Sequence, residues 1–237
     1  MVVDDLTCLN CGQELRGEFC LKCGQASSTQ RYTFSSLAQE VWAQLRKIEA
    51  TKTVWTLLAM LKDPGSFVRG YLSGKRVDYI NPIRFFFYAF FIEVTVKLFL
   101  GSYFPQNALV ADVKSGIRLE LANLGLTFVW GTIWAALYHK DDLNFVEYIV
   151  SAIFFAAETF VLSSLWLLIC IPFSTQYSGT LAVHAIGDLV LYFFYSCFFA
   201  YSLFETTVLT LIWKQIVIAT LFFGFAAWYF RAFGSMF

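Results

Sequence analysis

The order of polar and apolar positions divides the chain into a polar N-terminal third and a long apolar remainder. The polar part ends between residues 63 and 82, where several turn motifs follow one another. Beyond this point, apolar runs of about 20 residues recur with short polar breaks between them. The runs are continuous and do not alternate between apolar and polar residues, so they predict helices and not strands.

We predict about five membrane-spanning helices, because each run is long enough to cross the hydrocarbon layer of a bilayer. Their approximate limits are 83–104, 119–138, 146–172, 181–203 and 207–231. The predicted fold is an all-α membrane protein, with a transmembrane bundle over 83–237.

Two cap-plus-proline signals mark the entrance to this apolar part. Asp63-Pro64-Gly65 predicts the start of a short helix, because Asp caps a first turn and Pro suits the first helical position. Gly74 would end this helix, and Asn81-Pro82 repeats the start signal before the first long run. The apolar face of the short helix would consist of Phe67, Val68, Tyr71 and Leu72.

Cationic and aromatic side chains gather at the same entrance. Lys75, Arg76 and Arg84 are placed to meet anionic lipid headgroups. Tyr71 and Tyr79 suit the aromatic belt of a membrane interface. An ordinary solvated turn is the alternative, but the long apolar run that follows directly favours the interface.

Two amphipathic segments lie in the juxtamembrane region, residues 27–82. Thr33 or Ser35 can cap the first helix, whose apolar positions are Leu37, Val41, Leu45 and Ile48. The second carries Val54, Trp55, Leu58 and Leu61. Both are too polar to span a membrane. Either they lie along the inner membrane surface, with Trp42 and Trp55 as anchors, or they pack on each other as a helical hairpin.

Composition and charge agree with a membrane protein. The 237 residues are 58% hydrophobic and 14% charged, which is more apolar surface than a soluble domain of this size can bury. Net charge is zero, yet residues 1–84 carry 11 of the 17 Lys+Arg and only 8 of the 17 Asp+Glu. This basic excess predicts a cytosolic N-terminus, and five spans then place the C-terminus outside.

The first residues, Met1–Asp5, have neither a basic n-region nor an apolar h-region, so no signal peptide is expected. No long basic run or aromatic platform indicates a nucleic-acid partner. The expected location is therefore the cell (inner) membrane, with the lipid bilayer as the first partner of a multi-pass protein.

Residues 1–26 form a head with two cysteine knuckles. Cys8 and Cys11 share one C-x-x-C-G motif, and Cys20 and Cys23 share the other. This spacing lets the two thiolates of one turn face a single ion, so four cysteines predict a closed, structural Zn²⁺ site. An iron site with four cysteines is the other metal centre to consider. Two disulfides are the rival interpretation, which a cytosolic location disfavours.

A few ionisable residues interrupt the predicted spans, where charges are costly. Glu93 and Lys97 lie four apart on the first span and can neutralise each other. Glu158 lies within the third span, and His184 and Asp188 lie four apart on the fourth. They could line a polar pathway, but we favour interhelical bridges that fix the packing of the helices.

No catalytic motif is present: the chain has no H-E-x-x-H, no G-x-S-x-G and no glycine-rich phosphate loop. We therefore expect an interaction, scaffold or sensor protein whose head binds a cytosolic protein. A small transporter or channel that uses the buried charges is the alternative.

The motifs occur in a recognisable order: Cys-x-x-Cys-Gly, Gly-x-Phe-Cys-x-x-Cys-Gly-Gln, Asp-Pro-Gly, and Tyr-Leu-x-Gly-Lys-Arg-x-x-Tyr-x-x-Pro-x-x-Phe-Phe. This order, up to about residue 92, resembles an uncharacterised bacterial family of multi-pass membrane proteins with a zinc-ribbon head. The resemblance implies a topology and a zinc site, but no activity.

Overall fold

The computed structural model describes residues 7–29, 33, 50–104, 113–138, 143–173, 180–204 and 206–233. Within these ranges the regular secondary structure is helical, apart from two isolated β-bridges in the head. The amphipathic helix predicted from Leu37 to Ile48 lies outside the described residues, as does its candidate cap Ser35.

The described part of the chain contains seven α-helices and one short 3₁₀ helix, all C-terminal to the head. They are α2 (Ala50–Lys62), α3 (Pro64–Leu72), α4 (Pro82–Tyr103), α5 (Val113–Leu137), α6 (Phe145–Cys170), η1 (Ile171–Phe173), α7 (Thr180–Leu203) and α8 (Val208–Phe233). Helices α4 to α8 coincide with the five predicted apolar runs, except that α5 begins at Val113 and therefore earlier than predicted.

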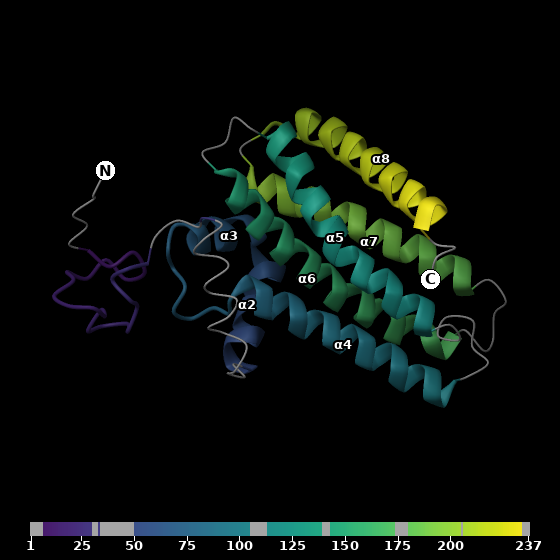
Figure 1. The fold of residues 1–237 in the computed structure, drawn as a ribbon, viewed down its shortest axis with the longest axis horizontal. Coiled ribbons are helices and arrows are strands. Elements are labelled where there is room, and N and C mark those ends of the chain that lie inside the picture. Colours follow the sequence, from purple (N-terminus) through teal and green to yellow (C-terminus); the bar gives the residue numbers. More distant parts are fainter. Residues whose placement is uncertain are drawn as a thin grey trace.

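The five long helices lie side by side and alternate in direction (Figure 1). Helix α4 begins at the end of the bundle nearest the head, and α7 returns to that end, where it meets α3. We call this the head-side end. Helices α2 and α3 and the cysteine head are gathered there, and α2 crosses this end instead of running alongside the bundle.

Helix α6 is the centre of the bundle, and its apolar side chains are mostly buried between α4, α5 and α7. Two adjacent rings connect it to both sides of the core. Phe154 packs edge-on against Phe67 and Tyr71, with ring centroids 5.1 and 5.0 Å away. Phe155 stacks on Trp130 at 5.4 Å and on Tyr195 at 5.6 Å. The core is therefore built from aromatic contacts, each of which adds to the burial of apolar area.

The predicted helix signals at the head-side end are confirmed. Asp63 caps α3 by accepting a hydrogen bond from the Ser66 amide at 3.1 Å. Gly74 follows α3 with a φ of +114°, and its amide donates to the Tyr71 carbonyl while the Lys75 amide donates to the Gly70 carbonyl. This is a Schellman motif, which satisfies the last carbonyls of the helix.

Gly65 also makes a tertiary contact, with Ser202 at the end of α7. A Cβ atom at this position would lie 1.9 Å from the Ser202 carbonyl carbon, so α3 touches the end of α7 through bare backbone. The Gly65 amide donates to Ser202 Oγ at 2.9 Å, and that hydroxyl donates in turn to Asp63. Arg69 Nε donates to the Leu203 carbonyl at 2.7 Å. This cation lies at the negative end of the α7 dipole, where it is stabilising.

Two stretches are long and apolar enough to cross a membrane, judged by length and composition over the described residues. They are Phe145–Phe173, with a mean hydropathy of 2.0, and Ile186–Leu203, with 1.5. They differ in burial, because half of the first window but only 28% of the second is buried inside the structure. The second stretch is therefore apolar on a surface that the described residues leave exposed.

Candidate metal centre and buried polar groups

The four cysteines of the head converge on one point. Cys8 Sγ lies 3.6 Å from Cys23 Sγ, and Cys11 Sγ lies 3.5 Å from Cys20 Sγ. All four sulfurs lie within 4.8 Å of one another. Four sulfurs around one ion at about 2.3 Å would be separated by about 3.8 Å in a tetrahedron. The head therefore has the geometry of a site that could bind a metal.

The head contains the same kind of turn twice, and the Cys-Leu-x-Cys-Gly-Gln pattern that begins at Cys8 recurs 12 residues later at Cys20. In the first turn the Gly12 amide donates to the Cys8 carbonyl at 2.8 Å, and in the second the Gly24 amide donates to Cys20 at the same distance. Both glycines have positive φ, 71° and 74°, as the spacing predicts for a turn that brings amides towards sulfur.

The electrostatics of the second turn favour a thiolate. A hydrogen bond from the Cys23 backbone amide is the main cause that lowers the pKa of Cys20, to about 6. Burial and the neighbouring cysteines raise the pKa of Cys11 to about 12, so the two shifts are opposite in direction. Cysteine binds metals as the thiolate, so Cys20 is the ligand that this electrostatic environment favours.

The two turns of the head face different surroundings. Leu9, in the first turn, lies against Gly74, where an added Cβ would be 2.7 Å from the Leu9 Cβ. Leu21, the equivalent residue of the second turn, is 90% exposed, and Phe19 beside it is 59% exposed. One knuckle therefore contacts the turn after α3 through Leu9, which is 39% exposed, and the other presents apolar side chains that are more exposed.

The residues predicted to lie at a membrane interface differ in their exposure. Lys75 is exposed, and Arg76 and Tyr79 are partly exposed. Tyr71, predicted for the aromatic belt, and Arg84, predicted to meet headgroups, are both buried within the protein. The Tyr71 ring fills the core beside Phe154, and its backbone carbonyl accepts a hydrogen bond from Arg76 Nε at 3.1 Å.

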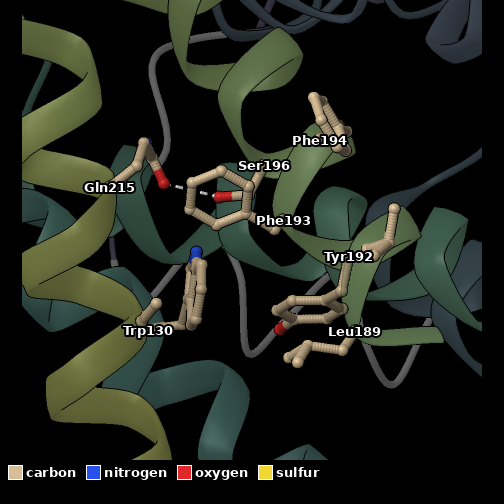
Figure 2. A pocket seen from close by; sticks show the side chains of 9 residues that line it. Trp130, Leu189, Tyr192, Phe193, Phe194, Ser196 and Gln215 are labelled. Atoms are coloured by element: carbon tan, nitrogen blue, oxygen red, sulfur yellow. Dashed lines mark hydrogen bonds between the residues drawn. The ribbon is translucent and has the colours of Figure 1, made fainter. Parts of the chain in front are cut away.

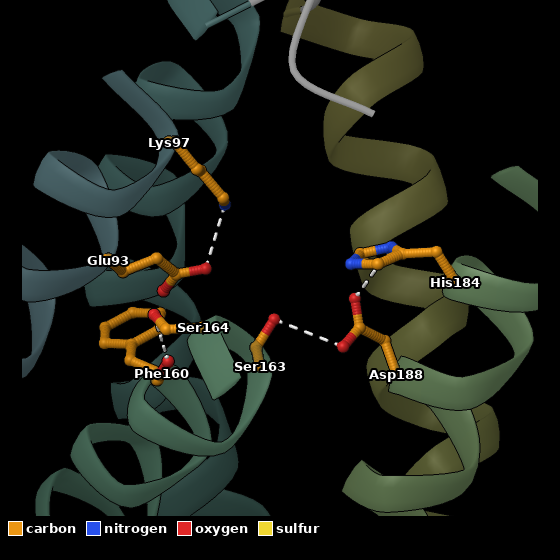
Figure 3. Close-up of polar contacts among 7 residues, drawn as sticks. All are labelled: Glu93, Lys97, Phe160, Ser163, Ser164, His184 and Asp188. Atoms are coloured by element: carbon orange, nitrogen blue, oxygen red, sulfur yellow. Dashed lines mark hydrogen bonds and ion pairs between the residues drawn. The ribbon is translucent and has the colours of Figure 1, made fainter. Parts of the chain in front are cut away.

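Glu93 and Lys97 form an ion pair on α4. Lys97 Nζ lies 2.8 Å from Glu93 Oε1, and the Glu93 side chain is almost completely buried (Figure 3). The spacing of four places both head groups on one face of the helix. The lysine is thus positioned to compensate a buried negative charge.

His184 and Asp188 form a second polar cluster. It also includes Ser163, which the sequence did not indicate as a partner. Asp188 Oδ2 lies 3.4 Å from His184 Nδ1, and Asp188 Oδ1 accepts a hydrogen bond from Ser163 Oγ at 3.2 Å (Figure 3). The carboxylate lies between serine and histidine, whereas a nucleophilic triad needs histidine in the middle. The cluster therefore joins α6 to α7 and is not arranged for acyl transfer.

Glu158 differs from both clusters. It is fully buried on α6, and neither carboxyl oxygen has a hydrogen-bond partner among the described residues. The Tyr195 hydroxyl on α7 is also buried without a hydrogen bond. Glu158 is therefore not one of the interhelical bridges expected from the sequence.

One apolar cavity lies between α5, α7 and α8 and has a volume of about 340 Å³ (Figure 2). Its polar wall is a buried hydrogen bond from Ser196 Oγ to Gln215 Oε1, 2.7 Å long. Gln215 Nε2 donates onward to the Tyr138 hydroxyl at 3.3 Å. Glu93, Glu158 and Asp188 do not line this cavity, so it does not connect the candidate pathway residues.

A family model described as "Protein of unknown function (DUF3667)" matches residues 52–93. The match includes most of α2, all of α3, the turn at Gly74 and α4 as far as Glu93. It supports an uncharacterised domain family and supplies no activity, and the cysteine head lies outside it. No curated protein and no solved structure matches the chain.

Proposed function

We propose that the chain is a multi-pass protein of the cell (inner) membrane whose N-terminal zinc ribbon is a cytosolic interaction module. Helices α4 to α8 would be the five spans. The head-side end would face the cytosol, and the end of α8 would face outside. The basic excess of residues 1–84 supports this orientation.

Exposed apolar side chains support membrane embedding. Helix α7 is mainly uncovered yet apolar, whereas the core helix of a soluble protein is apolar because it is buried. Its exposed apolar positions are Val183, Ile186, Leu189, Val190, Leu191, Phe194, Phe198 and Tyr201. Each of α4 to α8 has 22 to 26 residues, and so is about 33 to 39 Å long, enough for a hydrocarbon layer of about 30 Å.

A zinc ion would hold the head together. The cysteine sulfurs supply a closed set of four soft ligands, which zinc prefers and which leaves no open position for catalysis. Two sulfur ligands, Cys8 and Cys20, belong to the few buried side chains of residues 7–29, so packing contributes little there. The role of the metal would therefore be structural.

The observation that carries the interaction role is the exposure of Leu21. A turn fixed by a metal would hold this side chain and Phe19 outward. Because the turn would already be ordered, it would lose little conformational entropy when a partner binds. Leu9, the same residue of the other turn, already lies against Gly74. The head would thus use one knuckle to dock on the bundle and the other to bind a cytosolic protein.

Photocrosslinking in native membranes tests this role. Replacing Leu21 by p-benzoylphenylalanine should give one dominant protein adduct, identified by mass spectrometry. The same probe at Leu9 is the matched control and should give adducts within the chain. Introducing Cys11→Ser should abolish the Leu21 adduct because the turn loses its metal. A Leu21 probe that captures no defined protein, or one that is indifferent to Cys11→Ser, would refute the interaction role.

A small transporter or channel remains the alternative proposal, and it would use the buried charges Glu93, Lys97, Glu158 and Asp188. The apolar cavity gives it no support, because the acidic residues of this set do not line it. Proton or ion flux into vesicles that depends on Glu158 would favour transport over the interaction role.

A further inference from the structure

Helix α2 has one face that is fixed to the bundle. Thr56 and Met60 are both fully buried on this face. Thr56 Oγ1 accepts a hydrogen bond from the Ile80 amide at 3.1 Å, which ties α2 to the segment just before α4. Leu57, at the edge of this face, is partly buried and also packs against the core. These contacts fix the rotation of α2 about its own axis, so its other face has a defined direction.

That outer face is apolar, although the described part of the protein does not cover it. Its four large side chains are between 43% and 58% exposed: Val54, Trp55, Leu58 and Leu61. Their spacing places them along one stripe of the helix. A helix of a soluble protein normally carries polar residues on its outer side, so this stripe indicates a non-aqueous environment or a partner.

The charges of α2 indicate which environment that is. The helix contains Lys52 and Lys62 and no acidic residue. Lys75, in the turn that follows α3, is exposed at the same end of the bundle. Two exposed carboxylates, Asp63 and Asp78, lie in the same region, where the basic residues Lys52, Lys62, Lys75 and Arg76 outnumber them. An apolar stripe with tryptophan and an excess of cations is the composition of a helix that lies in the surface of an anionic bilayer.

The position of α2 agrees with this composition. It crosses the head-side end of the bundle, close to the start of α4 (Figure 1). If α4 to α8 span a bilayer, this end lies at the level of the headgroups. A helix that crosses the spanning direction at that level lies in the plane of the membrane.

We infer that α2 is an in-plane membrane helix that binds anionic lipids. Val54, Trp55, Leu58 and Leu61 enter the boundary between headgroups and acyl chains, and Lys62 and Lys75 contact anionic headgroups. The inference rests on the proposed membrane embedding of α4 to α8. For α2, it also chooses between the two arrangements that the sequence left open.

Photocrosslinking in reconstituted vesicles tests the inference on the full chain. A p-benzoylphenylalanine probe replaces Leu58 on the outer face or Leu57 on the inner face of the same helix. A third variant carries the probe at Phe194, an exposed position of α7. The vesicles contain phosphatidylcholine and phosphatidylglycerol, and mass spectrometry identifies each adduct.

The expected result is lipid adducts at positions 58 and 194, several-fold more abundant than at position 57. Phosphatidylglycerol should be enriched among the adducts at position 58 relative to its share of the vesicle. The inference about α2 is wrong if the probe at position 194 captures lipid but the probe at position 58 does not. The probe at position 58 would then capture residues 33–49, a second copy of the chain, or nothing. If position 194 captures no lipid either, the membrane embedding itself fails.

Discussion

The head and the bundle reach a defined structure by different physical means. In the head, 23 described residues from 7 to 29 surround four sulfurs, and most side chains are exposed. In the bundle, aromatic rings from distant parts of the chain fill a continuous core around α6. A ligand set depends on a few identical residues at fixed spacing, whereas a core depends on many residues that can substitute for one another. The two regions should therefore respond to different perturbations.

Metal removal should have the largest effect, and it should act on the head alone. Structural zinc contributes about 10–16 kcal/mol to the folding of small zinc domains at neutral pH. Chelation, or Cys11→Ser, should therefore unfold residues 7–29 and leave the bundle folded. Limited proteolysis would follow the unfolding of the head. Near-UV circular dichroism would follow the bundle, because the seven Trp residues of the chain lie outside the head. Loss of the bundle signal together with the head would show that the two regions are not independent.

Gly65→Ala should have the next largest effect, at the junction between α3 and α7. The added methyl group would meet the Ser202 backbone at 1.9 Å, so α3 must separate from the end of α7. We expect a loss of about 3 kcal/mol or more in the free energy of unfolding, measured in detergent. Gly70→Ala is the matched control in the same helix. Its nearest neighbour would be a flexible Lys75 side-chain atom at 3.8 Å, so it should be neutral or stabilise α3.

Glu158→Met should stabilise the bundle. The carboxyl group is buried without a hydrogen-bond partner, and an apolar side chain of similar length removes its desolvation cost. We expect the free energy of unfolding to increase by about 1–3 kcal/mol, measured by thermal unfolding in detergent. Glu93→Gln is the contrasting variant, and it should destabilise because it leaves Lys97 without its carboxylate at 2.8 Å. A loss of stability in Glu158→Met would mean that this carboxyl holds helices together after all.

Acidification should have the smallest effect, at the junction between α3 and α7. Hydrogen bonds from Ser202 and Ser66 lower the pKa of Asp63 below its usual value of 3.8. Because the folded-state pKa is depressed, this stabilisation is present above pH 3.8 and is lost as the pH falls through the lower value. Asp63 is exposed, so the contribution should be about 0.5 kcal/mol or less. Asp63→Asn should remove this acid dependence in unfolding experiments as a function of pH.

The sequence was sufficient where the deciding interactions are local. Asp63, Gly74 and Asn81 mark helix boundaries correctly because caps and stops depend on the next few backbone groups. The cysteine spacing likewise places two thiolates in each turn. Five long helices follow from apolar runs alone, although their passage through a membrane stays a prediction.

Contacts between distant segments could not be predicted in this way. Gly65 meets Ser202, 137 positions further along the chain, and one sequence contains no signal that pairs them. Tyr71 suits both a membrane interface and an aromatic core, because its ring is apolar and its hydroxyl is polar. The structure places it in the core. Ser163 was not identified, because a serine within an apolar helix gives no sign of which residue its hydroxyl will contact.

The coordination of the metal in the head is the most direct test of the account. X-ray absorption at the zinc edge, on the full chain purified without chelator, should give four sulfur ligands at about 2.3 Å. Metal analysis of the same sample should find about one zinc per chain, and Cys11→Ser should abolish both signals. A sample without zinc and with four free thiols, or one whose metal has oxygen or nitrogen ligands, would contradict the account.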